Sequence, residues 1–253
     1  MRLSAFILLL TACAGFGLPP QASQLFSAPE PEPSGATWLA SNDVPGAVIW
    51  FDASYEDSLG SVSKIVGAFS TNYTASEATT SRWPTVVDND DGFRAIRFDG
   101  GDDKLDIRGP GGALDYYASS PTGTFYFAFS RTNSSDYSVA IGGGSYFPAY
   151  WHINGNLYWL QSSYAIWSGI GTATGNHILV ATRSNSTYRA WLDGIYLGQV
   201  SGGNTDGNWT YFGRASSAYH DGDIYFAGWC TNIHSDATIS NNMSTVTGKA
   251  GWE

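Results

Sequence analysis

The chain has 253 residues, enough for one large domain, and a formal net charge of −10 with only 12 lysines and arginines. This charge excludes nucleic-acid binding, which needs clustered basic side chains to displace counterions from phosphates. Aromatic residues make up 15% of the chain, charged residues only 13%, and there are 30 glycines. This composition favours strands joined by tight turns and predicts an all-β protein.

The chain begins with a segment typical of targeting, residues 1–16. One basic residue precedes an apolar run over residues 3–10, which is too short to cross a bilayer and is typical of a signal peptide. Residues 10–13 also resemble a bacterial lipobox, in which Cys13 would receive the lipid. Two interpretations stay open: export to an extracellular or cell-surface location, with or without the lipid anchor at Cys13, and an apolar arm that is retained and docks on a partner.

A tether is expected over residues 17–35, which are rich in proline, serine and glutamate. Such a composition resists both helix and sheet and favours an extended chain. The folded domain is expected over residues 36–253. It contains a single cysteine, Cys230, so the sequence predicts neither a disulfide framework nor a zinc site.

The domain consists of short aromatic or β-branched runs bounded by glycine, asparagine, aspartate or serine, which predict strands. The expected strands are residues 46–53, 93–100, 123–131, 137–143, 150–155, 156–161, 177–184, 187–194, 209–214 and 223–231. The dipeptides Asn154-Gly155 and Asp193-Gly194 predict tight hairpin turns of type I′. Ten strands at nearly regular spacing predict a two-sheet antiparallel jelly-roll sandwich.

Four segments of this strand pattern resemble laminin G-like, concanavalin A-like jelly rolls of bacterial and phage surface proteins. They are residues 43–54, 95–107, 175–198 and 222–240. In the central hairpin of that family, His177, Asp193 and Gly194 stand at the matching positions. The last segment resembles the closing strand and its short terminal turn. The resemblance implies a jelly roll displayed on a cell surface or on a virion.

The stretch AIRFDGGDDKLDI, residues 95–107, is dense in aspartate. Calcium takes six to eight oxygen ligands, usually from several carboxylates and carbonyls, and the resemblance implies a structural calcium near such a turn. The expected metal ligands are Asp99, Asp102, Asp103, Asp221 and Asp223. The alternative is a turn whose aspartates cap free backbone N–H groups. The resemblance is weaker at the closing strand, where many relatives have acidic residues and this chain has Tyr225, Phe226 and Ala227.

The sequence contains no recognisable pattern of catalytic residues. A retaining glycosidase needs two carboxylates about 5 Å apart, and glucanases of this fold take them from a strand patterned Glu-x-Asp-x-Glu. The chain has five glutamates and no such strand. Asp102 and Asp106 could form a carboxylate pair, but both adjoin turns. A serine hydrolase would need a G-x-S-x-G elbow, which the sequence lacks. The four histidines are isolated in sequence. The sequence therefore predicts that the chain is not an enzyme, with glycoside hydrolysis as a minor alternative.

Residues 146–167 form the densest aromatic stretch and are interleaved with amide side chains, a pattern typical of sugar binding. Trp159 and Gln161 share one strand face, and Tyr158 and Leu160 share the other. If the Leu160 face is the core, Trp159 and Gln161 point to solvent. The candidate ligand-binding residues are Trp151, Asn154, Trp159, Gln161, Tyr164 and Trp167. The alternative is that these aromatic residues pack in the core.

The sequence thus predicts a non-catalytic, surface-displayed module that binds a glycan or another surface polymer. The competing interpretation is structural: a phage fibre, tail or capsid decoration subunit that contacts other virion subunits through the N-terminal arm and assembles as a homo-oligomer. Both interpretations place the domain outside a cell or on a virion surface. Calcium is the only cofactor that the residues suggest.

Overall fold

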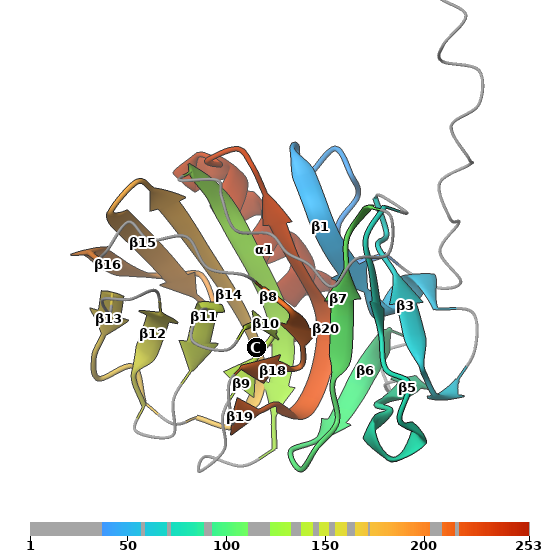
Figure 1. Cartoon of the computed structure of the whole chain (residues 1–253). Coiled ribbons are helices and arrows are strands. Elements are labelled where there is room, and N and C mark those ends of the chain that lie inside the picture. Colours follow the sequence, from blue (N-terminus) through green and yellow to red (C-terminus); the bar gives the residue numbers. More distant parts are fainter. Residues whose placement is uncertain are drawn as a thin grey trace, which may run out of the picture.

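The computed structural model describes residues 37–252 with internal gaps. The gaps are residues 57–58, 70–71, 89–92, 111–121, 133–137, 144–146, 152–154, 161–164, 172, 203–208 and 216–217. The described part is an antiparallel β-sandwich with one α-helix, which confirms the expected all-β jelly-roll class (Figure 1). No helix in this part has the length and apolar character that crossing a membrane requires.

The larger layer, sheet A, has nine strands in the spatial order β16-β15-β14-β8-β20-β6-β5-β2, with β1 paired to β20. Its strands are β1 (Ala47–Asp52), β2 (Gly60–Ser61), β5 (Thr85–Asp88), β6 (Arg94–Asp99), β8 (Thr122–Arg131), β14 (Gly175–Ser184), β15 (Thr187–Leu192), β16 (Ile195–Ser201) and β20 (Asp221–Cys230). Strands β8 and β14 pair antiparallel along all ten residues of each. This long pairing forms the middle of the layer.

Two smaller sheets form the second layer (Figure 1). Sheet B has the order β10-β17-β7-β4-β3, and sheet C has the order β13-β12-β11-β9. Their strands are β3 (Lys64–Val66), β4 (Thr74–Ser76), β7 (Leu105–Arg108), β9 (Ser138–Val139), β10 (Ile141–Gly142), β11 (Phe147–Trp151), β12 (Leu157–Leu160), β13 (Ala165–Trp167) and β17 (Tyr211–Phe212). A separate hairpin pairs β18 (Arg214–Ala215) with β19 (Ala218–Tyr219).

Strand β8 is buried on both faces, which explains its nearly continuous apolar run. Phe125, Phe127 and Phe129 point into the core between the two layers. Tyr126 and Ala128 point to the opposite side and belong to a second apolar cluster on the outer face of sheet A. The second layer closes the first core with Leu105, Ile107, Ile141, Leu157 and Phe212.

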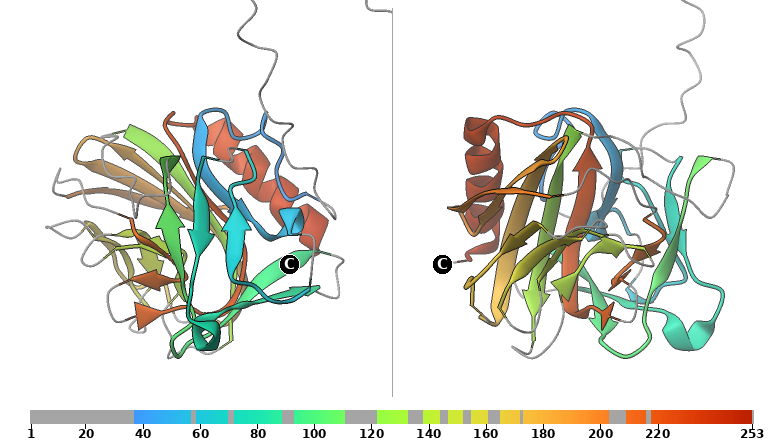
Figure 2. Two further views of the ribbon diagram at one scale, coloured as in Figure 1. Left: turned by 45° about the vertical axis from the view of Figure 1, so that its right-hand side comes forward. Right: turned by 60° about the vertical axis from the view of Figure 1, so that its left-hand side comes forward.

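Helix α1 (Asp236–Ala250) covers part of this outer face of sheet A (Figure 2). Its apolar side chains recur at the three- and four-residue steps of one helix face and are buried: Ile239, Met243, Val246 and Ala250. Ser235 caps the first turn by accepting from the Thr238 N–H, and Gly251 ends the helix in the left-handed conformation. The helix corrects the expectation of a short terminal turn after the closing strand.

The turn between β15 and β16 confirms the expected type I′ hairpin. Asp193 and Gly194 both have positive φ, at 50° and 82°, and Leu192 pairs directly with Ile195. The Asp193 carboxylate also lies 2.8 Å from Nδ1 of His177 on β14. Two of the three positions singled out by the family resemblance therefore meet, and they fix this hairpin against its neighbouring strand.

Candidate functional site

A row of polar side chains crosses the outer face of sheet B. Ser76 on β4, Asp106 on β7 and Tyr211 on β17 are direct cross-strand partners, so their side chains lie on one face of the sheet. Leu105 and Ile107 of β7 alternate with Asp106 and are buried in the core. Helix α1 covers the outer face of sheet A, whereas no described helix covers this opposite face (Figure 2).

Lys104 lies directly before β7 and binds two carboxylates. Its Nζ is 2.9 Å from Glu77 Oε2 and also contacts Asp106 Oδ1. Burial opposes the charge on Lys104, but Asp106 and Glu77 outweigh it and hold its pKa above the usual value. Burial also opposes the charge on Glu77, which would raise its pKa. Hydrogen bonds from Thr79 and Lys104 nevertheless keep that pKa below its usual value. We call Glu77, Lys104 and Asp106 the Lys104 cluster.

Backbone contacts hold this cluster in place. The Thr79 N–H donates to Glu77 Oε1 over 2.8 Å, and the Trp83 indole donates to the Glu77 carbonyl over 2.8 Å. The Lys104 N–H donates to the Arg82 carbonyl over 3.2 Å. Because these contacts position Glu77 and Lys104, the cluster is oriented before any ligand binds.

Tyr211 on sheet B, and Arg214 and Tyr219 on the β18–β19 hairpin, extend the cluster. The Lys104 ammonium lies 4.9 Å from the ring centroid of Tyr211. The Arg214 guanidinium lies 4.9 Å from the ring centroids of both Tyr211 and Tyr219. Contacts of a cation with an aromatic ring stabilise by about 0.5–2 kcal/mol each, so they restrain both rings. The partly buried groups here are therefore Asp106, Tyr211, Arg214 and Tyr219, beside the buried Glu77 and Lys104.

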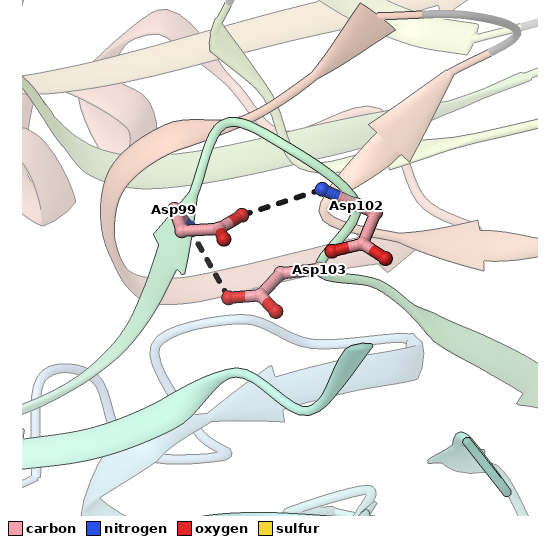
Figure 3. A group of neighbouring side chains, drawn as sticks. All are labelled: Asp99, Asp102 and Asp103. Carbon is pink, nitrogen blue, oxygen red and sulfur yellow. Dashed lines mark hydrogen bonds between the residues drawn. The ribbon is translucent and has the colours of Figure 1, made fainter. Parts of the chain in front are cut away.

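The turn between β6 and β7 brings Asp99, Asp102 and Asp103 together (Figure 3). One carboxylate oxygen of each lies within 4.8 Å of the others. Asp99 Oδ1 accepts from the N–H groups of Gly101 at 2.8 Å and Asp102 at 3.4 Å, and Asp103 Oδ2 accepts from the Asp99 N–H at 3.2 Å. Asp99 and Asp103 therefore cap the turn, as the alternative to a metal site expects.

The same turn has the chemistry of a cation site. Burial and the charges of Asp99 and Asp102 raise the pKa of Asp103 to about 6, so a nearby cation would stabilise its ionised form. Arg82 supplies a counter-charge, with Nε 3.7 Å from Asp102 Oδ2. The three carboxylates would supply about half of the six to eight oxygens that calcium takes. Calcium binding at this turn stays a prediction.

The two aspartates expected from the closing strand lie differently. Asp223 is buried and accepts two hydrogen bonds from the Arg97 guanidinium, at 2.7 and 2.9 Å. Asp223 therefore serves an ion pair rather than the expected metal site, because Arg97 already balances its charge. Asp221 lies opposite Asp99 in sheet A, with its side chain against Gly100. It borders the acidic turn without joining the grouped carboxylates.

The expected aromatic platform is corrected at Trp167. This side chain is 4% exposed, packs in the core between the layers, and donates from Nε1 to the Gly198 carbonyl over 3.1 Å. On β12, Leu157 is buried and Tyr158 is only half-buried, which reverses the assumption that the face of Tyr158 and Leu160 is the core. The backbone of Trp151 and Trp159 is in strands, but their side chains lie outside the described part, as do the whole residues Asn154, Gln161 and Tyr164. Their sugar-binding role stays a prediction.

The described histidines other than His177 act as internal bridges. His220 is fully buried, accepts from the Val139 N–H at 3.3 Å through Nδ1, and contacts the Asp223 carbonyl at 3.3 Å through Nε2. Burial lowers its pKa to about 4. His234 contacts the Tyr126 hydroxyl at 2.7 Å and the Pro45 carbonyl at 3.0 Å. These contacts agree with the expected packing role.

Sequence reasoning missed most of the Lys104 cluster. Lys104 and Asp106 are two residues apart on one strand face, a signal that alternation could have identified. Glu77 and Tyr211 are distant in sequence and reach Lys104 only through strand order, so no local pattern marks them. The sequence alone suggests Asp106 only as a carboxylate partner of Asp102.

The fold is similar to that of several solved proteins. Trypanosoma rangeli sialidase, in complex with a difluorinated sugar acid, matches with a TM-score of 0.53 and 11% identity, over 81% of this chain and 33% of the sialidase. Domain 4 of AbnA, an extracellular arabinanase from Geobacillus stearothermophilus, matches with a TM-score of 0.48 and 15% identity. The match covers 63% of this chain and 81% of that domain. The Ruminococcus gnavus sialidase module CBM40, bound to sialyllactose, matches with a TM-score of 0.38 and 10% identity. The match covers 49% of this chain and 84% of that module. No protein-family model and no curated protein matches the chain.

The sialidase likeness shows the β-sandwich fold, but not the laminin G-like family in particular. It also corrects the expectation that the chain is not an enzyme, since the matching fold belongs to an enzyme. The chain spans about a third of the length of that sialidase.

Proposed function

We propose that this domain binds carbohydrate on the outer face of sheet B, in a protein that is exported and displayed outside the cell. The observation that carries the proposal is the Lys104 cluster, in which one ammonium and two carboxylates are held by the main chain beside Tyr211. Sugar hydroxyl groups both donate and accept hydrogen bonds, and the partly buried Asp106 carboxylate and Tyr211 hydroxyl offer partners for both.

Burial and charge support this choice of face. The outer face of sheet A is partly covered by α1, whereas Ser76, Asp106 and Tyr211 on sheet B are only partly buried. Lys104 and Glu77 are buried beside them and hold Asp106 in place. Charged hydrogen bonds to a ligand are stronger than neutral ones, and fixed groups lose little entropy when the ligand binds. The sialidase likeness adds that this sandwich occurs in a glycan-processing protein.

A glycan array tests the proposal, probed with the full chain and with Tyr211→Ala and Tyr211→Phe. We expect the wild-type protein to bind a defined group of glycans, Tyr211→Ala to lose at least tenfold in affinity, and Tyr211→Phe to keep most of it because its ring still contacts Lys104. Chromatography of the bound glycans after incubation reports whether any is cleaved. Absence of binding on the array, or equal binding by Tyr211→Ala, would overturn the proposal.

A further inference from the structure

A second polar and aromatic group lies on the outer face of sheet A, next to the start of α1. Trp191 on β15 and Tyr196 on β16 are cross-strand partners with ring centroids 5.1 Å apart. Arg189, two residues before Trp191 on the same face, places its guanidinium 4.7 Å from the Trp191 centroid and 5.1 Å from the Tyr196 centroid. Asp236 approaches from the first turn of α1.

The guanidinium orients all of these groups. Arg189 Nη1 and Nη2 donate to the two carboxylate oxygens of Asp236, each over 2.7 Å, and Nε donates to the Tyr196 hydroxyl over 3.3 Å. The hydrogen bonds from Arg189 hold the pKa of Asp236 below its usual value. A strand and a helix support the two ends of this arrangement, so its geometry is fixed before any ligand arrives.

The arrangement keeps hydrogen-bonding capacity toward solvent. A guanidinium has five N–H groups, and the bonds to Asp236 and Tyr196 use three. Each Asp236 oxygen accepts one of these bonds and can accept another, and 63% of that side chain is exposed. Tyr196 is 46% exposed, and its hydroxyl can still donate. An exposed aromatic ring therefore stands beside adjacent donors and acceptors.

This combination matches one class of ligand. Two neighbouring hydroxyl groups of a sugar ring can each donate to Asp236 while accepting from Arg189, and the apolar C–H face of the sugar can stack on Tyr196. The Arg189–Asp236 pair has no net charge, whereas the chain as a whole has a net charge of −10. An anionic sugar would be repelled both by the exposed carboxylate and by the molecule.

We propose that Tyr196, Arg189 and Asp236 form a second binding site, for a neutral pyranose with adjacent hydroxyl groups, on the face of the sandwich opposite sheet B. The site stands on its own contacts and does not rest on the Lys104 cluster. Together the two faces would let one domain bridge two glycan chains, which raises the overall binding strength through effective concentration.

The test is an amide NMR titration of the full chain with the methyl pyranosides of glucose, galactose and mannose, with methyl β-D-glucuronide as the anionic counterpart of the glucoside. We expect saturable shifts at residues 195–197 and 235–238 with at least one neutral sugar, and at least fivefold weaker binding of the glucuronide. Tyr196→Ala and Asp236→Asn should bind at least tenfold more weakly, whereas Tyr196→Phe keeps the ring and should bind nearly as the wild type does.

The outcomes separate this site from sheet B. If Tyr211→Ala leaves the shifts at residues 195–197 intact, the second site is independent, whatever happens at sheet B. No saturable shift with any neutral sugar, an unchanged titration in Tyr196→Ala, or equal affinity for the glucuronide would overturn the inference. A thermal unfolding scan of each variant excludes misfolding as the cause of lost binding.

Discussion

Trp167 illustrates how a buried indole differs from a binding platform. Replacing it by alanine should lower the free energy of unfolding by about 3–5 kcal/mol, because a large core side chain is removed and a cavity remains. Urea unfolding followed by tryptophan fluorescence measures the change. Ile195→Ala is the control: its side chain is 68% exposed, and the expected change is within about 0.5 kcal/mol. A similarly small change for Trp167→Ala would contradict its core position.

Asp52 is a buried carboxyl whose pKa is raised to about 6 by desolvation. A raised folded-state pKa means that its stabilising contribution is full below about pH 4 and is lost as the pH rises through 6. Asp52→Asn should remove this dependence while its side-chain oxygen still accepts from the Ser54 N–H. Between pH 4 and pH 7, the free energy of unfolding of the variant should rise relative to that of the wild type by up to about 3 kcal/mol. Unfolding curves that keep a constant offset between the two proteins would contradict the pKa.

The acidic turn gives a prediction for calcium. Millimolar calcium should raise the melting temperature of the wild type, because ligand binding to the folded state stabilises it, and chelator should reverse the rise. Asp103→Asn should lose most of the rise, since it removes one of three grouped carboxylates. Magnesium is the control cation. No calcium-dependent shift in the wild type would leave the aspartates as turn caps alone.

At the scale of elements, the Lys104 cluster joins β7 to the segment after β4. Lys104→Met should destabilise the protein by about 2–4 kcal/mol at pH 7, because Glu77 and Asp106 lose their shared cation in a largely buried place. The pKa of Glu77 is lowered in the wild type, so its stabilising contribution is present above its unfolded pKa and is lost as the pH falls. The difference between variant and wild type should therefore shrink toward pH 4. Denaturant titrations at both pH values measure it, and a pH-independent loss would point to packing instead of charge.

The long central strands were predictable from the sequence, whereas the helix and short strands such as β3, β4 and β5 were not. Strands β1, β6, β8, β14, β15 and β20 lie close to their expected ranges because apolar alternation and bounding turn residues act locally. Residues 236–250 are rich in serine, threonine and asparagine, which are poor helix formers. Their helical signal was the spacing of four apolar residues after the Ser235 cap. Packing on sheet A stabilises this helix more than its intrinsic propensity does.

At the scale of the whole molecule, the sandwich followed from the number and spacing of strands, but the site did not. Glu77, Lys104 and Tyr211 meet because β4, β7 and β17 are neighbours in sheet B, and strand order is a non-local property that the chain's local patterns do not encode. The aromatic density that suggested a platform marks, at Trp167, a core residue instead. Large cores need large aromatic side chains, so density alone could not separate the two roles.

The most direct test of the account is a calorimetric titration of the full chain with the glycan that the array identifies. Wild type and Asp106→Asn are compared with Asp88→Asn, an exposed carboxylate on β5 of the other layer. We expect at least tenfold weaker binding for Asp106→Asn and wild-type affinity for Asp88→Asn, with both variants folded. Equal affinity of Asp106→Asn and wild type would show that carbohydrate does not bind at the outer face of sheet B.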